Sequence, residues 1–198
     1  MSNVYIIGLG MIRFTKYPDR TVRDMAHEVT NLALEDAGLD KKALQAAFFS
    51  NTFWGMFSNQ HSIRGQVALR SMGIDAIPVT NVENACAGAS TALHLAYTGV
   101  RAGMVDVALS VGSEKITDPD KMKSLTAYAT CMDVDNFESH INMMMDLNKT
   151  FKVAIPPDQA SPGDGRSIFM DAYAMGAKWH MDRFGSTQRQ LAALCAKN

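Results

Sequence analysis

The chain has 198 residues, of which 47% are hydrophobic and 20% are charged, and its formal net charge at pH 7 is −1. These values describe a globular protein of one domain, or one and a half, that can bury a sizeable core. They argue against nucleic-acid binding, because Lys and Arg form no cluster, and against a membrane protein, because no apolar run is long enough to span a bilayer.

Apolar runs alternate with helical patterns over the first 112 residues. Strands are expected at residues 4–9, 46–50, 77–82 and 105–111, and helices at 21–37, 61–72 and 88–101. In the first of these helices, Thr21 and Asp24 fit a capping box and Gly38 supplies the stop. Strands separated by helices predict parallel βαβ units, and continuous apolar strands predict a sheet covered on both faces. The expected fold class is α/β.

The alternation ends after Gly112. Residues 116–165 show no clear hydrophobic period and contain several prolines, and a stretch this long within a compact domain usually has a function of its own. Helical patterns return at 167–183 and from about 187, with Gln190 in a capping-box position. We therefore expect a βαβ core at residues 1–115 and a second region, with its returning helices, at 116–198.

Methionine is abundant, with 14 residues, and several cluster at 143–145 beside Met132. Its flexible thioether suits adaptable packing against a partner or a flexible ligand, although methionine is also a common core filler. The three cysteines, Cys86, Cys131 and Cys195, form no Cys-x-x-Cys pair. Neither a disulfide framework nor a zinc site is expected, and no basic segment suggests a signal peptide, so the reducing cytoplasm is the expected compartment.

Cys86 carries the clearest chemical signal, in the run Asn84-Ala85-Cys86-Ala87-Gly88-Ala89-Ser90. It lies where an expected buried strand turns into the N-terminus of the helix at 88–101. The start of a helix carries partial positive charge and free N–H groups, which favour a thiolate over a thiol. Its small neighbours leave room for a substrate. Cys86 is interpreted either as a nucleophile or as a buried structural cysteine, the commoner role of a lone cysteine.

Other candidates are weaker. Gly8-Leu9-Gly10 follows an expected strand, but Arg13 replaces the third glycine of a dinucleotide-binding motif, so NAD binding is not expected. The five histidines share no metal-like spacing and are interpreted as surface or packing residues; His94 is more than two helical turns from Cys86, too far to be its base. Glu114 follows the last expected strand, where α/β proteins place functional groups, and a solvated pair with Lys115 is the alternative.

At the cysteine run, the sequence resembles the thiolase superfamily, specifically the branch like the thiolase domain of sterol carrier protein x. The resemblance extends over nearly the whole chain. The other motifs that carry it are Ile6-Ile7-Gly8-Leu9-Gly10-Met11, Gly73-Ile74 with Ile77-Pro78-Val79, Val111-Gly112-Ser113-Glu114-Lys115, His180-Met181-Asp182-Arg183-Phe184-Gly185 and Ala196-Lys197-Asn198.

The resemblance implies that Cys86 attacks an acyl-CoA thioester, becomes acylated, and passes the acyl group to CoA or to a carbanion formed from a second acyl-CoA. Coenzyme A is then a substrate, and no other cofactor is implied. Residues 116–165 correspond to the loop domain that covers CoA in thiolases. Met175 and Gly176 resemble the segment that lines the pantetheine tunnel, although Ala174 stands where many members have histidine.

The resemblance also implies what lies beyond this chain. A whole thiolase has two similar halves packed in α/β/α/β/α layers, and this chain corresponds to roughly the N-terminal half. The family's activating histidine and its second cysteine would lie beyond Asn198. A fragment, a site completed by another polypeptide and a protein without activity all remain open. By resemblance we also expect a homodimer, and a zinc-ribbon acyl-CoA-binding subunit is a further partner.

Three functions therefore remain open. The first is a thiolase-like acyltransferase of lipid metabolism, similar to acetyl-CoA acetyltransferases. The second is a CoA-thioester retro-aldolase of the same superfamily, whose chemistry would not need Cys86. The third is a non-catalytic subunit that binds acyl-CoA or a partner.

Overall fold

The computed structural model describes residues 3–151 and 168–197. The chain forms two compact units, Met1–Ser124 and Leu125–Asn198. The functional division that the sequence suggests after residue 115 stays a prediction.

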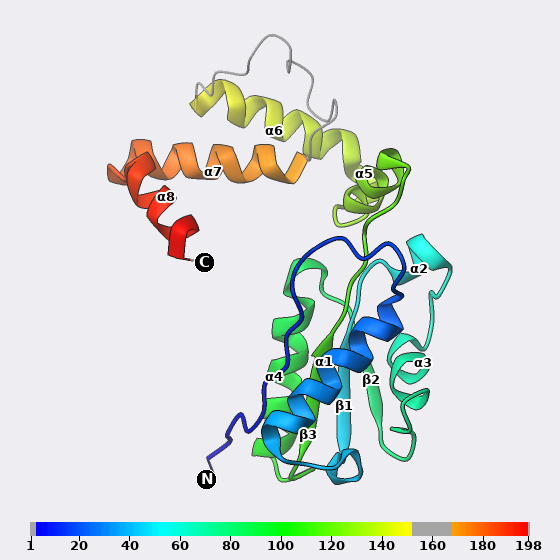
Figure 1. The fold of residues 1–198 in the computed structure, drawn as a ribbon. Helices are drawn as coiled ribbons and strands as arrows, with labels where there is room; N and C mark the ends of the chain where they lie inside the picture. Colours follow the sequence, from blue (N-terminus) through cyan, green and yellow to red (C-terminus); the bar gives the residue numbers. More distant parts are fainter. Residues whose placement is uncertain (1–2, 152–167, 198) are drawn as a thin grey trace. The chain divides into compact units, whose positions relative to one another are not determined.

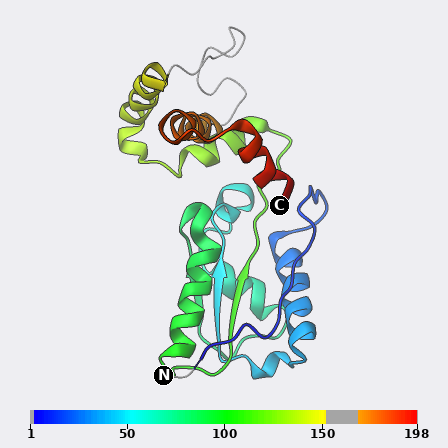
Figure 2. The ribbon, with the colours of Figure 1, turned by 90° about the vertical axis from the view of Figure 1, so that its left-hand side faces the viewer.

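The first unit is built on a parallel sheet with helices on both faces. Its strands are β1 (Ala46–Ser50), β2 (Val79–Val82) and β3 (Ala108–Gly112), in the order β2-β1-β3. One face is covered by α4 (Gly88–Arg101), and α1 (Val22–Ala37) lies on the other, where it packs against α3 (Arg64–Arg70) (Figures 1 and 2). This arrangement confirms the predicted α/β class and the parallel βαβ units.

The remaining elements of this unit are short. They are η1 (Lys41–Ala43), α2 (Trp54–Ser58) and η2 (Ala85–Ala87), and α5 (Lys121–Ala129) spans the boundary to the second unit. The second unit also contains η3 (Val134–Asn136), α6 (Phe137–Phe151), α7 (Ile168–Phe184) and α8 (Gln188–Lys197). Within it, α6 and α7 pack side by side (Figure 1).

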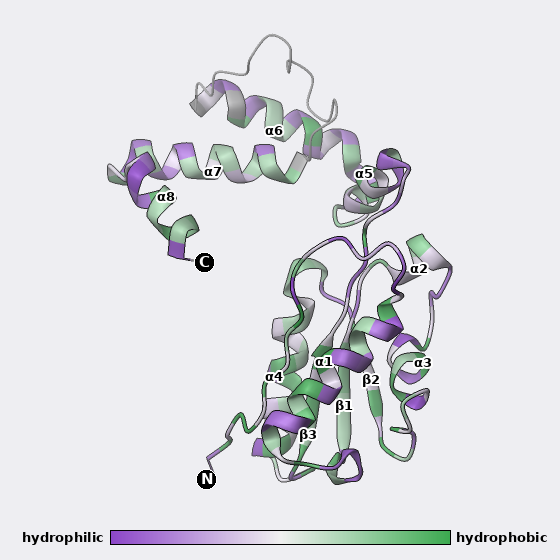
Figure 3. Cartoon of the chain, in the orientation of Figure 1, coloured by the Kyte–Doolittle hydropathy of each residue, from purple (hydrophilic) through white to green (hydrophobic). Residues whose placement is uncertain are grey.

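The hydrophobic core of the first unit lies between the sheet and the helices α1 and α3. Phe49 of β1 and Leu69 of α3 are fully buried, and the ring of Trp54 packs against that of Phe49 at a centroid distance of 6.4 Å. Four of the five residues of β1 are buried, because this central strand is covered on both faces. Hydrophilic and hydrophobic residues alternate along α1, as expected of a helix that buries one face (Figure 3).

Several local signals in the sequence are confirmed. Thr21 and Asp24 form both hydrogen bonds of the capping box at the start of α1, and Gly38 closes that helix with a φ of 63°. Helix α8 begins with a similar exchange between Thr187 and Gln190. The expected helix at 88–101 matches α4 in both its bounds.

The strand expected at residues 4–9 is wrong. These residues have no regular structure, and apolar side chains such as Tyr5 and Leu9 are about 70% exposed. The segment instead approaches α1: a Cβ atom at Gly8 or Gly10 would collide with the helix, and the Leu9 N–H donates to Asp36 Oδ2 at 2.8 Å. The glycines that suggested a nucleotide motif are therefore explained by close backbone packing.

Two further expectations need correction. The helix expected at 61–72 is shorter, because Ile63 adopts a left-handed φ of 47° and α3 begins only at Arg64. The segment 116–165, expected to be irregular, contains α5, η3 and α6; the consecutive methionines at 143–145 obscure the helical period of α6. The part of that segment from 152 to 165 lies outside the described residues.

None of the helices within the described ranges is both long and apolar enough to cross a membrane.

Candidate active site

The carboxyl ends of the three strands lie level with one another. Ser50, the last residue of β1, is in register with both Val82 of β2 and Gly112 of β3. The chain therefore leaves the sheet three times along one edge, where open α/β sheets place their functional groups. The residues that follow the strands directly are all polar: Asn51, Glu83 and Ser113.

Cys86 lies at this edge, in the short η2 between β2 and α4, and it is exposed. The residue before it, Ala85, has a φ of 42°, in the left-handed region that a residue with a Cβ atom adopts only at a cost of about 1–3 kcal/mol. A hydrogen bond of 2.6 Å from the Ala85 N–H to Glu83 Oε1 holds this conformation. Cys86 is thus not buried, as the alternative of a structural cysteine required, and its role as the nucleophile stays a prediction.

The first turn of α4 follows Cys86 directly. Its N-cap residue is Ala87, whose methyl group cannot accept a hydrogen bond from the helix start. The Gly88 N–H donates to the Ala85 carbonyl and the Ala87 N–H donates to the Asn84 carbonyl at 2.9 Å, so the start of α4 offers an anion its positive dipole rather than these two groups. The turn itself is fixed by Thr91, whose hydroxyl accepts from Asn84 Nδ2 at 2.9 Å and donates to the Ala87 carbonyl at 2.9 Å.

Close packing places this turn against the end of β1. Gly88 is buried, and a Cβ atom there would lie 2.5 Å from Ser50 Oγ. Glu83 provides a second link, to the loop after β1, because its Oε1 also accepts from the Thr52 hydroxyl at 3.3 Å. The loop that carries Cys86 is therefore joined to the neighbouring strand by both packing and hydrogen bonding.

Glu114 joins the loops after β1 and β3. Its carboxylate accepts hydrogen bonds from Asn51 Nδ2 at 3.0 Å, from the Thr52 N–H at 2.7 Å and from the Phe53 N–H at 3.2 Å. Lys115 is not its ion-pair partner, since the Lys115 ammonium donates to the backbone carbonyls at Pro18 and Arg20. The solvated Glu114–Lys115 pair that the sequence left open is therefore wrong.

Asn51 is the buried centre of this network. Its side chain is 3% exposed and donates to the Ser113 carbonyl at 2.8 Å as well as to Glu114. Its Oδ1 accepts from the Trp54 N–H at 3.1 Å and from Arg64 Nη1 at 3.0 Å. The same Arg64 nitrogen donates to the Thr52 carbonyl at 3.0 Å. A fixed positive charge therefore lies beside the network.

Burial raises the pKa of Glu114 above its ordinary value, although the residue itself is partly accessible to solvent. Hydrogen bonds from backbone N–H groups, including those of Thr52 and Phe53, and the charge of Arg64 oppose this rise. Although Glu114 is exposed as a whole, its pKa is thus shifted upward by the local burial of its carboxyl group.

The structure gives His94 and His27 roles that do not involve Cys86. His94 is exposed on α4. The His27 ring lies 2.7 Å from the Ala68 carbonyl oxygen, which fits a packing residue between α1 and α3. Among the described residues, no group of three or more His, Cys, Asp or Glu side chains could hold a metal ion.

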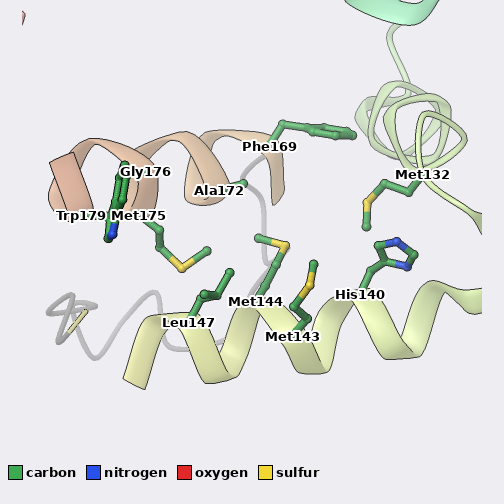
Figure 4. Close-up of a pocket in the computed structure, with 10 residues that line it drawn as sticks. All are labelled: Met132, His140, Met143, Met144, Leu147, Phe169, Ala172, Met175, Gly176 and Trp179. Atoms are coloured by element: carbon green, nitrogen blue, oxygen red, sulfur yellow. The ribbon is translucent and has the colours of Figure 1, made fainter. Parts of the chain in front are cut away.

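Met175 and Gly176 lie in the second unit, on α7, where both line an apolar cavity between α6 and α7 (Figure 4). Met175 is buried, whereas Gly176 has open space beside its Cα atom. Their role as substrate-binding residues stays a prediction.

Sequence reasoning missed Glu83, Asn51 and Arg64. A signal for the first two exists, because each directly follows an expected strand. Arg64 could not be found in this way, since it reaches the site from the start of a helix.

The chain is similar to one protein family and to several known proteins. Residues 4–156 match the family model described as the thiolase N-terminal domain. An acetyl-CoA acetyltransferase of Methanocaldococcus jannaschii is 38% identical over 192 residues, which cover 97% of this chain and 42% of that protein. Sterol carrier protein 2 of Bos taurus is 28% identical over 199 residues, covering 100% of this chain and 32% of that protein.

A third relative is the benzoylsuccinyl-CoA thiolase subunit BbsB of Thauera aromatica, 29% identical over 199 residues, which cover 98% of this chain and 42% of that protein. The chain thus spans less than half the length of each of these relatives.

The raised pKa of Glu114 predicts a specific pH dependence. A carboxyl group whose pKa is raised by folding stabilises the folded state below its ordinary value of 4.5, and this contribution is lost as the pH rises through the raised pKa. Glu114→Gln cannot ionise. We expect the free energy of unfolding of the wild type, relative to this variant, to fall as the pH rises from about 4.5 through the raised pKa of Glu114.

Denaturant titrations of both proteins at a series of pH values measure this difference, in which the carboxyl groups common to both cancel. A difference that grows in favour of the wild type with rising pH would show that the backbone hydrogen bonds outweigh burial.

Proposed function

The chain belongs to the thiolase family, and we propose that it is the part of an acyl-CoA acyltransferase that carries the nucleophile, Cys86. The observation that carries this proposal is the placement of Cys86: it is exposed, it lies at the carboxyl edge of a parallel sheet, and the N-terminus of α4 follows it at once. The likeness to acetyl-CoA acetyltransferases and to a CoA thiolase subunit supports the choice of substrate class.

In the proposed reaction, the Cys86 thiolate attacks the carbonyl carbon of an acyl-CoA thioester. A new carbon–sulfur bond forms to Cys86, the bond to the CoA sulfur breaks, and the departing thiolate takes up a proton. The negative charge that develops on the carbonyl oxygen needs stabilisation that is held in advance, and the positive end of the α4 dipole lies directly after Cys86. The acyl group then passes to CoA, in thiolysis, or to a carbanion from a second acyl-CoA, in Claisen condensation.

Glu83 acts as a positioning residue in this scheme. It accepts from the amide of the residue before Cys86, so it sets the backbone from which the sulfur projects. Orientation matters greatly to such a reaction, because a displacement of about 1 Å can reduce a rate by about a hundredfold. The hydrogen bond from Thr52 to the same carboxylate oxygen joins this position to the loop after β1.

Turnover would need more than these residues. We propose that the proton transfers depend on groups outside this chain, supplied by a longer polypeptide or by a second subunit. Assembly into a homodimer and association with a zinc-ribbon acyl-CoA-binding subunit belong to the same proposal, and the subunit relative from Thauera aromatica supports assembly from several chains. The retro-aldolase alternative is less favoured, because its chemistry would not use Cys86 or the contacts that position it.

The first test is acylation. Incubation of the protein with acetyl-CoA should add one acetyl mass to the peptide that contains Cys86, because the exposed Cys86 sulfur can attack the activated thioester. Peptide mass spectrometry after rapid acid quenching measures the adduct. Cys86→Ala should abolish it, whereas Cys195→Ala, which removes another exposed cysteine, should leave it unchanged. Equal acetylation in Cys86→Ala would refute the assignment of the nucleophile.

The second test concerns Glu83. Glu83→Ala should slow acetylation of Cys86 by about tenfold to a hundredfold, because the Ala85 amide loses its acceptor. Glu83→Gln should recover most of the rate, since its amide oxygen accepts the same two hydrogen bonds. The rate of adduct formation, measured by quenched-flow mass spectrometry over a range of acetyl-CoA concentrations, separates this loss from weaker binding.

Asp36→Ala is the matched control for this series. It also removes a carboxylate that accepts a backbone N–H, that of Leu9, but on the far end of α1 from the strand ends. It should leave the acetylation rate unchanged. If Glu83→Gln is as slow as Glu83→Ala, the hydrogen bond to Ala85 is not what positions Cys86.

A further inference from the structure

Thr52, the second residue after β1, uses both of its backbone groups to bind polar side chains at the end of the sheet. Its N–H donates to Glu114 Oε2 at 2.7 Å, and its carbonyl accepts from Arg64 Nη1 at 3.0 Å. The same Arg64 nitrogen donates to Oδ1 of the buried Asn51 at 3.0 Å. Hydrogen bonds to charged groups are stronger than those between neutral groups, so the backbone of Thr52 is firmly held. We call Asn51, Arg64 and Glu114 the polar network.

The side chain of Thr52 binds a group outside the polar network. Its hydroxyl donates to Glu83 Oε1 at 3.3 Å, and that oxygen also accepts from the Ala85 N–H at 2.6 Å. Ala85 precedes Cys86 and has a left-handed φ of 42°, a conformation that persists only when neighbouring groups hold it. Thr52 therefore connects the polar network with the turn that carries Cys86.

The turn needs support on both sides of the cysteine. On its C-terminal side, Gly88 packs closely on β1, since a Cβ atom there would lie 2.5 Å from Ser50 Oγ. On its N-terminal side, the support for Ala85 comes from the side chain of Glu83, an exposed residue. An exposed glutamate side chain loses much conformational freedom when it is held in one rotamer. A second hydrogen bond from a half-buried threonine favours the rotamer that Ala85 requires.

From these contacts we propose that Thr52 is a positioning residue for Cys86, through which the polar network holds Glu83 and, with it, the amide of Ala85. The reaction of Cys86 rests on the proposed function, whereas the connection from the polar network to Ala85 rests on the hydrogen bonds alone. Thr52 is not a catalytic residue in this account, because it acts through Glu83.

Amide hydrogen exchange at Ala85, followed by nuclear magnetic resonance, tests this connection without any substrate. Thr52→Val keeps the shape of the side chain but removes the hydroxyl, so Glu83 loses one of its two donors. We expect the Ala85 amide to exchange about threefold to tenfold faster, the effect of losing one ordinary hydrogen bond. Thr52→Ser keeps the hydroxyl and should exchange like the wild type. Equal exchange in Thr52→Val and the wild type would overturn the proposal.

Two controls show whether the effect is local. Ala47 of β1, whose N–H donates to the Pro78 carbonyl at 3.0 Å, should exchange at the same rate in Thr52→Val and the wild type. Thr98→Val removes a hydroxyl that donates to the His94 carbonyl at 2.8 Å within α4, and it should leave the Ala85 amide unchanged. If Ala47 accelerates as much as Ala85, or if Thr98→Val acts like Thr52→Val, the proposal is overturned.

Acetylation kinetics test the positioning role. In Thr52→Val, the rate of Cys86 acetylation at saturating acetyl-CoA should fall about threefold to tenfold, because the sulfur is less well oriented. The acetyl-CoA concentration that gives half of this rate should stay that of the wild type, since binding is not affected. Thr52→Ser should recover the saturating rate. A saturating rate in Thr52→Val equal to that of the wild type would contradict the positioning role.

A double substitution tests whether the polar network acts through Thr52. The Glu114 carboxylate accepts from three N–H groups, those of the Asn51 side chain and of the Thr52 and Phe53 backbone. Glu114→Gln leaves one accepting oxygen for them, so it should speed exchange at Ala85 when Thr52 is present. In Thr52→Val the same change should have at most about a twofold effect, because the connection is already lost. Equal effects in both backgrounds would overturn the role of Thr52.

The outcomes separate this inference from the proposed function. Acetylation of Cys86 in the wild type, with the same saturating rate in Thr52→Val, would overturn the inference alone. Faster exchange at Ala85 in Thr52→Val, in a protein whose Cys86 is never acetylated, would refute the nucleophile and leave the connection from the polar network to Ala85 in place.

Discussion

The register of the three parallel strands is the constraint on which the candidate site depends. Because Ser50 is level with both Val82 and Gly112, the chain leaves the sheet at one height in each strand. Every loop that begins there carries backbone groups that no longer have a strand partner. Burying such a group without a hydrogen bond costs about 1–3 kcal/mol, so side chains that reach across the edge are strongly stabilising.

Two glutamates and one asparagine meet this requirement. Asn51 and Glu114 bind the backbone of the loops after β1 and β3, and Glu83 binds the amide of Ala85 beside Cys86. The hydrogen bond from Ala85 to Glu83 therefore also fixes the backbone beside Cys86. A nucleophile benefits from such rigidity, because its orientation is settled by folding rather than during the reaction.

The sequence predicted those features whose signals are local. In each of the caps of α1 and α8, the two residues that bind one another are only three positions apart in the sequence. The central strand β1 is a continuous, largely apolar run. Residues 4–9 show the limit of this reasoning, since an apolar run indicates a tendency to be buried but not the presence of a neighbouring strand. Glycines that pack on α1 explain that segment better.

In the candidate site too, the sequence predicts the local features but not the contacts between distant segments. Cys86 was found because a strand, a turn and a helix start follow one another in the chain, whereas the partners of Glu114 come from about 60 residues away. The register of the strands and the packing of the helices bring such residues together, and neither can be deduced from a single sequence. Arg64 enters the site only because α3 begins beside the loop after β1.

Alkylation of the native protein tests the central claim, that the fold makes Cys86 reactive, without any assumption about substrate. The rates at which iodoacetamide modifies Cys86 and Cys195 can be followed together by peptide mass spectrometry, since both cysteines are exposed. We expect Cys86 to react faster by about tenfold or more in the folded protein and the two rates to converge in denaturant. Equal rates in the folded protein would contradict the account.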